Sequence, residues 1–207
     1  MRAGLIGGAG ILAVMAAAQA PESPISIGFV IDNGGGMREN GRMVRAAARG
    51  LLAMVQPADE AFLMNFNRET YIDADFASSA AQLAAAAERI DFHGFSAVWD
   101  AVGQSIRHLE TSGKRARKIL VVVTGGDDSG SRESLGQLLQ KARESGVPVY
   151  SIGLTRGAAR RDGQAARRAI GALADASGGK DFYPSNLDQV EDATAQIARS
   201  IRGNSPK

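Results

Sequence analysis

The chain has 207 residues, of which 44% are hydrophobic and 22% are charged, and its formal net charge is +2. This length suits one globular domain with a full-sized core, and the absence of cysteine excludes disulfides, thiolate metal sites and a cysteine nucleophile. Basic and acidic residues are interspersed, so nothing indicates a nucleic-acid partner. We interpret the two most basic stretches, 115–118 and 156–161, as solvated loop ends.

The N-terminus predicts a secretory signal peptide. Arg2 is followed by an uncharged apolar run that ends in small residues. We favour cleavage between residues 18 and 19, and cleavage between 20 and 21 is possible although it leaves a proline first. The mature protein would then be secreted or periplasmic, without a membrane span. An uncleaved anchor is the second choice, because the run falls short of the ~20 residues that cross a bilayer comfortably.

The leader also contains a misleading motif. Gly8, Gly10 and Ala13 match the glycine pattern of a dinucleotide-binding turn, and Asp32 follows at a suitable distance. Too few residues precede Gly8 to form the buried strand that such a turn requires, and the prolines of the segment 21–24 would interrupt its helix. We therefore expect no dinucleotide site.

After the leader, strands and helices alternate. Residues 25–32 form a continuous apolar run that predicts a strand buried on both faces, and apolar spacing of three and four predicts a helix over about 40–55. The segments 59–67 and 71–76 are predicted strands, close enough to pair as a hairpin. Ser79 with Gln82 marks the start of a helix that runs to about residue 90.

The second half of the chain continues this alternation. We predict a helix after 93–97, buried strands over 118–124 and 147–154, a helix capped by Ser131, and further helices over about 164–176 and after Asn186. The result is an α/β fold, a doubly wound and mostly parallel open sheet flanked by helices, with one antiparallel edge strand. Binding sites in such sheets lie beyond the carboxyl ends of the strands, which directs attention to the loops after Asp32, Phe95 and Thr124.

Four ordered segments in and around these loops carry a family resemblance: VIDNGGGM (30–37), GFSAVWDAV (94–102), VVVTGGDDSGSR (121–132) and SGVPVYSIGL (145–154). Through them the chain from about 24 to 202 resembles a von Willebrand factor type A domain of the bacterial secreted kind, with 203–207 as a C-terminal tail. The resemblance implies a Rossmann-like fold and protein ligands. It also implies a loop-ordering role for Asp100. Trp99 falls where the family usually has an aromatic residue, and we expect it to pack in the core.

The resemblance further implies a metal-ion-dependent adhesion site for Mg²⁺ or Mn²⁺. Its ligand positions fall on Asp32, Gly34, Gly36, Ser96 and Gly125, and the three glycines supply no side-chain oxygen. Because Mg²⁺ requires near-octahedral oxygen coordination, we expect a degenerate site with no metal and no cofactor. If Mg²⁺ or Mn²⁺ did bind, Asp127 or Asp128 would have to replace a lost ligand. We interpret both as acids placed favourably ahead of a helix.

We therefore predict a non-catalytic protein-binding module of the adhesion and assembly type, whose contact rim comprises Asp32, Phe95, Ser96, Asp127 and Asp128. The first alternative is a metal-dependent binder that uses Asp32, Ser96 and one substitute acid. The second is a secreted hydrolase, in which Ser96, His93 and Asp32 would form a triad. A third possibility, an anion held by the backbone of Gly34 to Gly36, conflicts with the nearby charge of Asp32.

Overall fold

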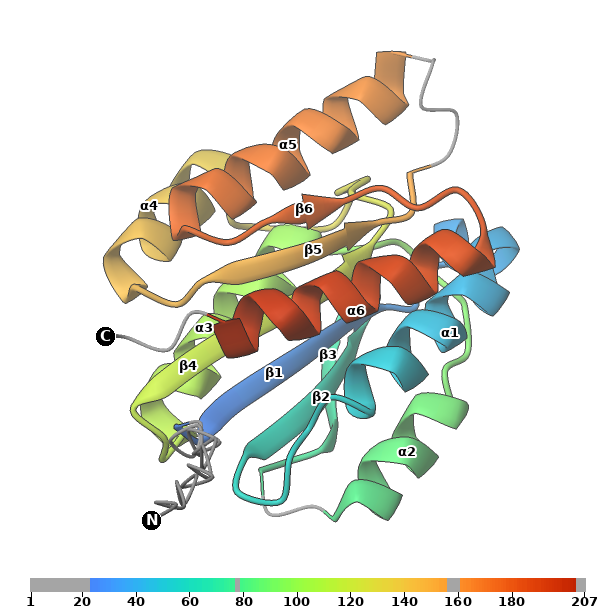
Figure 1. Cartoon of the computed structure of the whole chain (residues 1–207). Helices are drawn as coiled ribbons and strands as arrows, with labels where there is room; N and C mark the ends of the chain where they lie inside the picture. Colours follow the sequence, from blue (N-terminus) through green and yellow to red (C-terminus); the bar gives the residue numbers. More distant parts are fainter. Residues whose placement is uncertain (1–22, 77–78, 156–160, 204–207) are drawn as a thin grey trace, which may run out of the picture.

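The predicted α/β class is confirmed by a computed structural model that describes residues 23–76, 79–155 and 161–203. The leader, and the basic stretch 156–161 except its last residue, lie outside the described residues. Within the described part, six strands form one sheet in the order β3-β2-β1-β4-β5-β6 (Figure 1). None of the described helices is long and apolar enough to cross a membrane.

The sheet is parallel except at one edge. Strands β1 (Ile25–Asp32), β2 (Glu60–Phe66), β4 (Arg117–Thr124), β5 (Val149–Gly153) and β6 (Asp181–Phe182) pair in parallel. Strand β3 (Thr70–Ala74) pairs antiparallel with β2, as the predicted hairpin requires. All eight residues of β1 are buried, which explains its continuous apolar run.

Helices cover both faces of the sheet (Figure 1). One core cluster joins the sheet to α1 (Gly41–Leu52), α2 (Ala80–Glu88) and α6 (Leu187–Gly203). The second core cluster joins it to α3 (Val98–Ser112), α4 (Leu135–Ser145) and α5 (Arg161–Ser177). Trp99 belongs to this second cluster, which confirms its core position.

Side-chain caps fix several helix starts. The predicted Ser79–Gln82 capping box is present, and Asn186 Oδ1 accepts a hydrogen bond from the Gln189 backbone N–H at 2.9 Å. The prediction that Ser131 caps α4 is wrong, because α4 begins three residues later with Ser134 in a capping box with Gln137. The Ser131 hydroxyl instead donates to Asp128 Oδ1 and accepts from the Asp100 backbone N–H in the first turn of α3.

His108 of α3 is largely buried between the helix and the segment after β3. Its side chain is 17% exposed, and its ring stacks on Phe76 and meets Phe62 edge-on. The Nε2 atom lies 2.8 Å from an Asp75 carboxylate oxygen. The imidazole therefore closes the α3 side of the core next to the hairpin strands.

Candidate site at the strand ends

The candidate site lies at the switch point of the sheet, where β1 and β4 are neighbours. The strand that follows β1 in the chain, β2, lies on one side of this pair. The strand that follows β4, β5, lies on the other side. Asp32 ends β1 and Thr124 ends β4. Loops that follow parallel strands diverge at such a point and leave space for a ligand.

Asp32 is the centre of a buried hydrogen-bond network. Its carboxylate Oδ1 accepts from the Ser96 hydroxyl at 2.7 Å and from the Gly34 backbone N–H at 2.9 Å. Its Oδ2 accepts from the Thr124 hydroxyl at 2.7 Å. The residue is 1% exposed, so both carboxylate oxygens are satisfied by the chain itself and not by solvent.

Burial raises the pKa of the Asp32 carboxyl above its ordinary value. Loss of water disfavours the charged form by more than the hydrogen bonds from the two hydroxyls and the nearby backbone N–H groups favour it. The folded chain therefore retains a proton on Asp32 over a pH range in which the unfolded chain has released it.

This shift predicts a pH dependence of stability. As the pH rises from about 4 towards the raised pKa, the unfolded chain binds fewer protons than the folded chain, so the contribution of Asp32 to stability falls. We expect the free energy of unfolding of the natural chain, minus that of Asp32→Asn, to decrease by up to about 1.4 kcal/mol per pH unit in this window. Urea titrations at several pH values measure this difference, and a rising difference would contradict the burial argument.

Four of the five metal-ligand positions inferred from the resemblance line one small cleft. Asp32, Gly36, Ser96 and Gly125 surround it together with the substitute acid Asp127. The cleft has a volume of about 20 Å³, which is room for a single water molecule. The structure thus brings the three loops together, but of these four positions only Asp32 and Ser96 carry a side-chain oxygen.

The fifth position, Gly34, is occupied in a different way. A Cβ atom added to Gly34 would lie 2.1 Å from Ser96 Oγ and 3.1 Å from Asp32 Oδ1. The Ser96 hydroxyl therefore fills the space into which a side chain at position 34 would begin to extend. The absence of that side chain is what allows Ser96 to donate directly to Asp32.

The two candidate replacement acids have different surroundings. Asp127 is exposed and lines the cleft. Asp128 points away to α3, where its Oδ1 accepts from the Trp99 backbone N–H at 3.3 Å and from the Ser131 hydroxyl at 2.5 Å. It lies at the N-terminus of α3, not at that of α4 as the sequence order indicates. Its carboxylate offsets the partial positive charge of that helix end.

Asp100 and the loop after β4 hold each other in place. The two carboxylate oxygens of Asp100 accept hydrogen bonds from the backbone N–H groups of Arg132 at 3.1 Å and Glu133 at 2.9 Å. These bonds fix the segment that leads into α4, which is the loop-ordering role inferred from the family resemblance.

The residues of the hydrolase alternative do not form a triad. Nε2 of His93 lies 3.1 Å from the Asn67 side-chain nitrogen, and the Ser96 hydroxyl donates to the Asp32 carboxylate without an imidazole between them. A serine nucleophile needs a base that takes its proton and is itself oriented by a third group. Here the serine serves as a hydrogen-bond donor inside a closed network.

The rim of the site differs in exposure from one residue to the next. Phe95 is 67% exposed, the highest value among the large hydrophobic side chains of the described residues. Ser96 and Asp32, by contrast, are buried. Of the predicted rim residues, Phe95 and Asp127 are therefore exposed to a large partner, whereas Asp32 and Ser96 are not.

Backbone hydrogen bonds join the three loops into one unit. The Gly35 N–H donates to the Gly94 carbonyl at 2.9 Å, and the Ser129 N–H donates to the Ser96 carbonyl at 3.0 Å. The first loop itself is a short 3-10 helix, Gly35–Asn40, that begins within the glycines. The face that carries Phe95 is thus held by contacts among all three loops.

Sequence reasoning missed Thr124 as a member of this network. Its hydroxyl donates to Asp32 Oδ2 and accepts from the Gly126 backbone N–H at 3.0 Å. The available signal was a hydroxyl residue at the end of a buried strand next to β1.

The comparison with known families agrees with this arrangement. The family model described as von Willebrand factor type A domain matches residues 26–196, which is most of the chain. The chain belongs to the von Willebrand factor type A domain family. A comparison with curated proteins finds no match.

Solved structures of other von Willebrand factor type A domains share the fold. The pilus adhesin SpaC from Lactobacillus rhamnosus GG is similar over 90% of this chain and 31% of its own length, with a TM-score of 0.69 and 17% identity. The vWF domain of the type V pili tip protein Mfa5 from Porphyromonas gingivalis matches 91% of this chain and 98% of its own, with a TM-score of 0.70 and 11% identity.

A von Willebrand factor type A protein from Catenulispora acidiphila matches 87% of this chain and 43% of its own length, with a TM-score of 0.66 and 16% identity. The chain thus spans less than half the length of SpaC and of the Catenulispora protein.

The donor set of this domain does not fit the metal ion that the family implies. Mg²⁺ takes near-octahedral oxygen coordination, and the cleft offers the carboxylate of Asp32, one serine hydroxyl and one exposed acid at its edge. Both Asp32 oxygens already accept short hydrogen bonds. Among the described residues no group of three or more His, Cys, Asp or Glu side chains is placed to hold a metal ion.

Proposed function

We propose that this von Willebrand factor type A domain is a non-catalytic protein-binding module for adhesion or assembly, and that its degenerate adhesion site works without a metal ion. The observation that carries the proposal is the closed Asp32–Ser96–Thr124 network. In it, hydrogen-bond donors of the chain occupy the carboxylate oxygens that a metal ion would need. The loop face is then held in shape by this network instead of by coordination.

Phe95 is the proposed anchor for the partner. Its large aromatic ring is 67% exposed, and the residue directly precedes Ser96 of the buried network, on a loop tied to its two neighbours. Aromatic side chains at the centre of an interface supply much of the binding energy, and a loop that is already ordered loses little entropy on binding. Asp127 adds a negative charge to the same rim.

We further propose that the mature domain works outside the cytoplasm of a bacterium. The predicted signal peptide supports this location, and two of the similar structures are described as pilus proteins. The partner would then be a protein met in the periplasm or at the cell surface.

Phe95→Ala should reduce partner capture by at least about tenfold, because the change removes the exposed anchor without touching the core. The experiment immobilises the purified domain, presents extracellular proteins of the source bacterium, and quantifies the captured proteins by mass spectrometry, once with Mg²⁺ and once with a chelator. We expect the same proteins at similar amounts under both conditions.

Tyr71→Ala is the matched control, since Tyr71 is another exposed aromatic residue, 45% exposed, but lies on β3. The Tyr71→Ala variant should capture the same proteins as the natural chain, in similar amounts. Capture that disappears in the chelator would favour the metal-dependent alternative. If Phe95→Ala captures as much partner as the natural chain, the rim does not bind the partner.

A further inference from the structure

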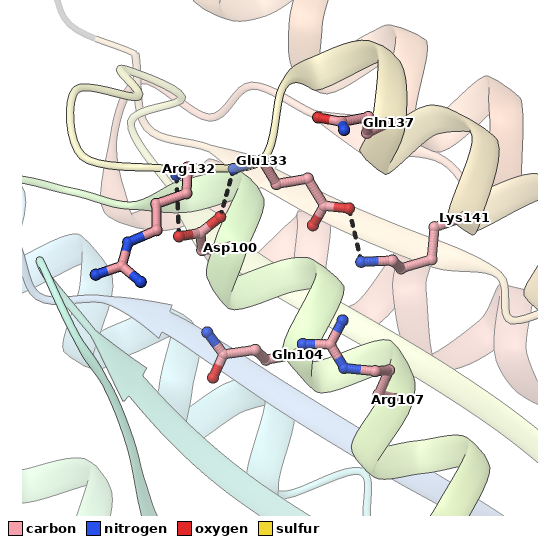
Figure 2. Close-up of a pocket in the computed structure, with 7 residues that line it drawn as sticks. All are labelled: Asp100, Gln104, Arg107, Arg132, Glu133, Gln137 and Lys141. Carbon is pink, nitrogen blue, oxygen red and sulfur yellow. Dashed lines mark hydrogen bonds and ion pairs between the residues drawn. The ribbon is translucent and has the colours of Figure 1, made fainter.

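A second polar surface lies between α3 and the segment that leads into α4. Two adjoining hollows of about 370 and 470 Å³ share Asp100, Gln104 and Arg132 in their walls. Figure 2 shows the first hollow, with Arg107 and Gln104 on α3 and Arg132 on the loop opposite. The second hollow continues to Arg68 in the turn between β2 and β3. We call this continuous surface the α3 groove.

The acidic groups of the α3 groove are already paired within the protein. Asp100 accepts two backbone N–H bonds, and Glu133 Oε1 accepts from Lys141 Nζ at 2.6 Å. Glu69 Oε2 accepts from the Tyr71 hydroxyl at 3.1 Å. The hydrogen-bond acceptors that line the groove are therefore largely used by the chain itself.

One of these pairs rests directly on helix α3. A Cβ atom added to Gly103 would lie 2.4 Å from Glu133 Oε2, so the glycine allows the Glu133–Lys141 ion pair to pack against the helix backbone. The two side chains are only 17% and 27% exposed. This ion pair forms a fixed wall of the groove (Figure 2).

The donors of the groove, by contrast, remain available. The guanidinium groups of Arg68, Arg107 and Arg132 make no hydrogen bond or ion pair with any residue in the described part of the chain. Gln104 Oε1 accepts from the Thr70 hydroxyl at 2.7 Å, which leaves the amide N–H₂ of this side chain as its free group. The surface thus offers donors to a ligand that brings acceptor oxygens.

We propose that the α3 groove binds an acidic segment of a partner protein, through carboxylates placed on Arg68, Arg107 and Arg132. A planar guanidinium pairs bidentately with a carboxylate, and amide groups such as that of Gln104 suit peptide carbonyls. The fixed acids Glu69, Asp100 and Glu133 line the same hollows as the arginines and would repel a continuous polyphosphate. A peptide whose acidic side chains are spaced can place carboxylates on the arginines and uncharged residues next to the fixed acids.

The test uses a fluorescein-labelled ten-residue peptide of alternating Glu and Gly, with anisotropy measured at low ionic strength. The Arg107→Gln/Arg132→Gln variant should bind this peptide at least about tenfold more weakly, because two exposed charge pairs are lost. Both arginines are exposed, so the variant should melt at the temperature of the natural chain.

The control variant is Arg42→Gln/Arg199→Gln, which changes the net charge equally but alters exposed residues of α1 and α6 on the other face of the sheet. It should bind within about twofold of the natural chain, since the charges of opposite faces are largely screened from each other. Equal affinity of all three proteins would overturn the proposal. Displacement of the peptide by tripolyphosphate at lower concentration than by unlabelled peptide would overturn the choice of occupant. Because the groove does not include Phe95, either result leaves the proposed function to its own test.

Discussion

Adding Mg²⁺ should raise the melting temperature of a Gly34→Ser/Gly36→Ser/Gly125→Asp variant and leave that of the natural chain unchanged. The three substitutions restore side-chain oxygens at the positions that, by family resemblance, have lost them. Gly36, Gly125 and the unchanged Asp32 and Ser96 already surround one cleft, so the new oxygens should converge there. With Mg²⁺ at about 100 times its Kd, binding to the folded state should contribute about 2.7 kcal/mol.

Without metal the same variant should be less stable than the natural chain by about 1–3 kcal/mol. A side chain at position 34 displaces the Ser96 hydroxyl from Asp32, and a Cβ at position 125 would lie 3.1 Å from the Met37 sulfur. Ser96 can rotate, and a bound ion would give its hydroxyl a new partner. Metal binding and relief of crowding should therefore be coupled.

Gly34→Ala/Gly36→Ala/Gly125→Ala is the matched control, because it adds the Cβ atoms without any ligand oxygen. It should lose stability in a similar way and show no response to Mg²⁺. Calorimetric melting of both variants with and without the ion makes the comparison. A restored variant that folds and still ignores Mg²⁺ would show that the three loops do not correspond to the metal loops of the family.

Asp32→Ala should lower the free energy of unfolding by about 3 kcal/mol, because it leaves buried donors without an acceptor. Ser96 and Thr124 both donate to this carboxylate, as does the Gly34 N–H. Asp32→Asn keeps the shape and one acceptor oxygen, so it should cost less than about 1 kcal/mol. Urea unfolding at neutral pH measures both values.

The role of Asp32 as an internal acceptor also predicts what chelators do. If Asp32 holds the loops together through hydrogen bonds alone, EDTA should change the stability of neither the natural chain nor these variants. A natural chain that loses stability in EDTA while Asp32→Ala does not would show instead that the carboxylate acts by holding a metal ion.

The fold could be predicted from local patterns because its strands are buried on both faces and its helices are amphipathic. The apolar run of β1 and the Ser79–Gln82 capping box are patterns within a few neighbouring residues of the sequence. Ser131 shows the limit of such signals, because two serines three residues apart are both plausible caps for α4. The choice between them depends on Asp128 and Asp100, which engage Ser131 through the start of α3.

The site was less accessible to sequence reasoning because its bonds join distant segments. Ser96 is 64 residues from Asp32, and Thr124 is 92 residues from it. The loop motifs identified Ser96 as a ligand position, but only packing shows that its hydroxyl fills the space of the missing side chain at Gly34. The α3 groove likewise joins arginines from three separate segments, none of which forms a basic run.

Calorimetric titration of the natural chain with Mg²⁺ and with Mn²⁺ tests the central claim most directly. The closed network around Asp32 predicts no heat beyond that of dilution and no effect of a chelator on the melting temperature. Saturable binding of either ion in the micromolar range, lost in Asp32→Ala, would contradict it.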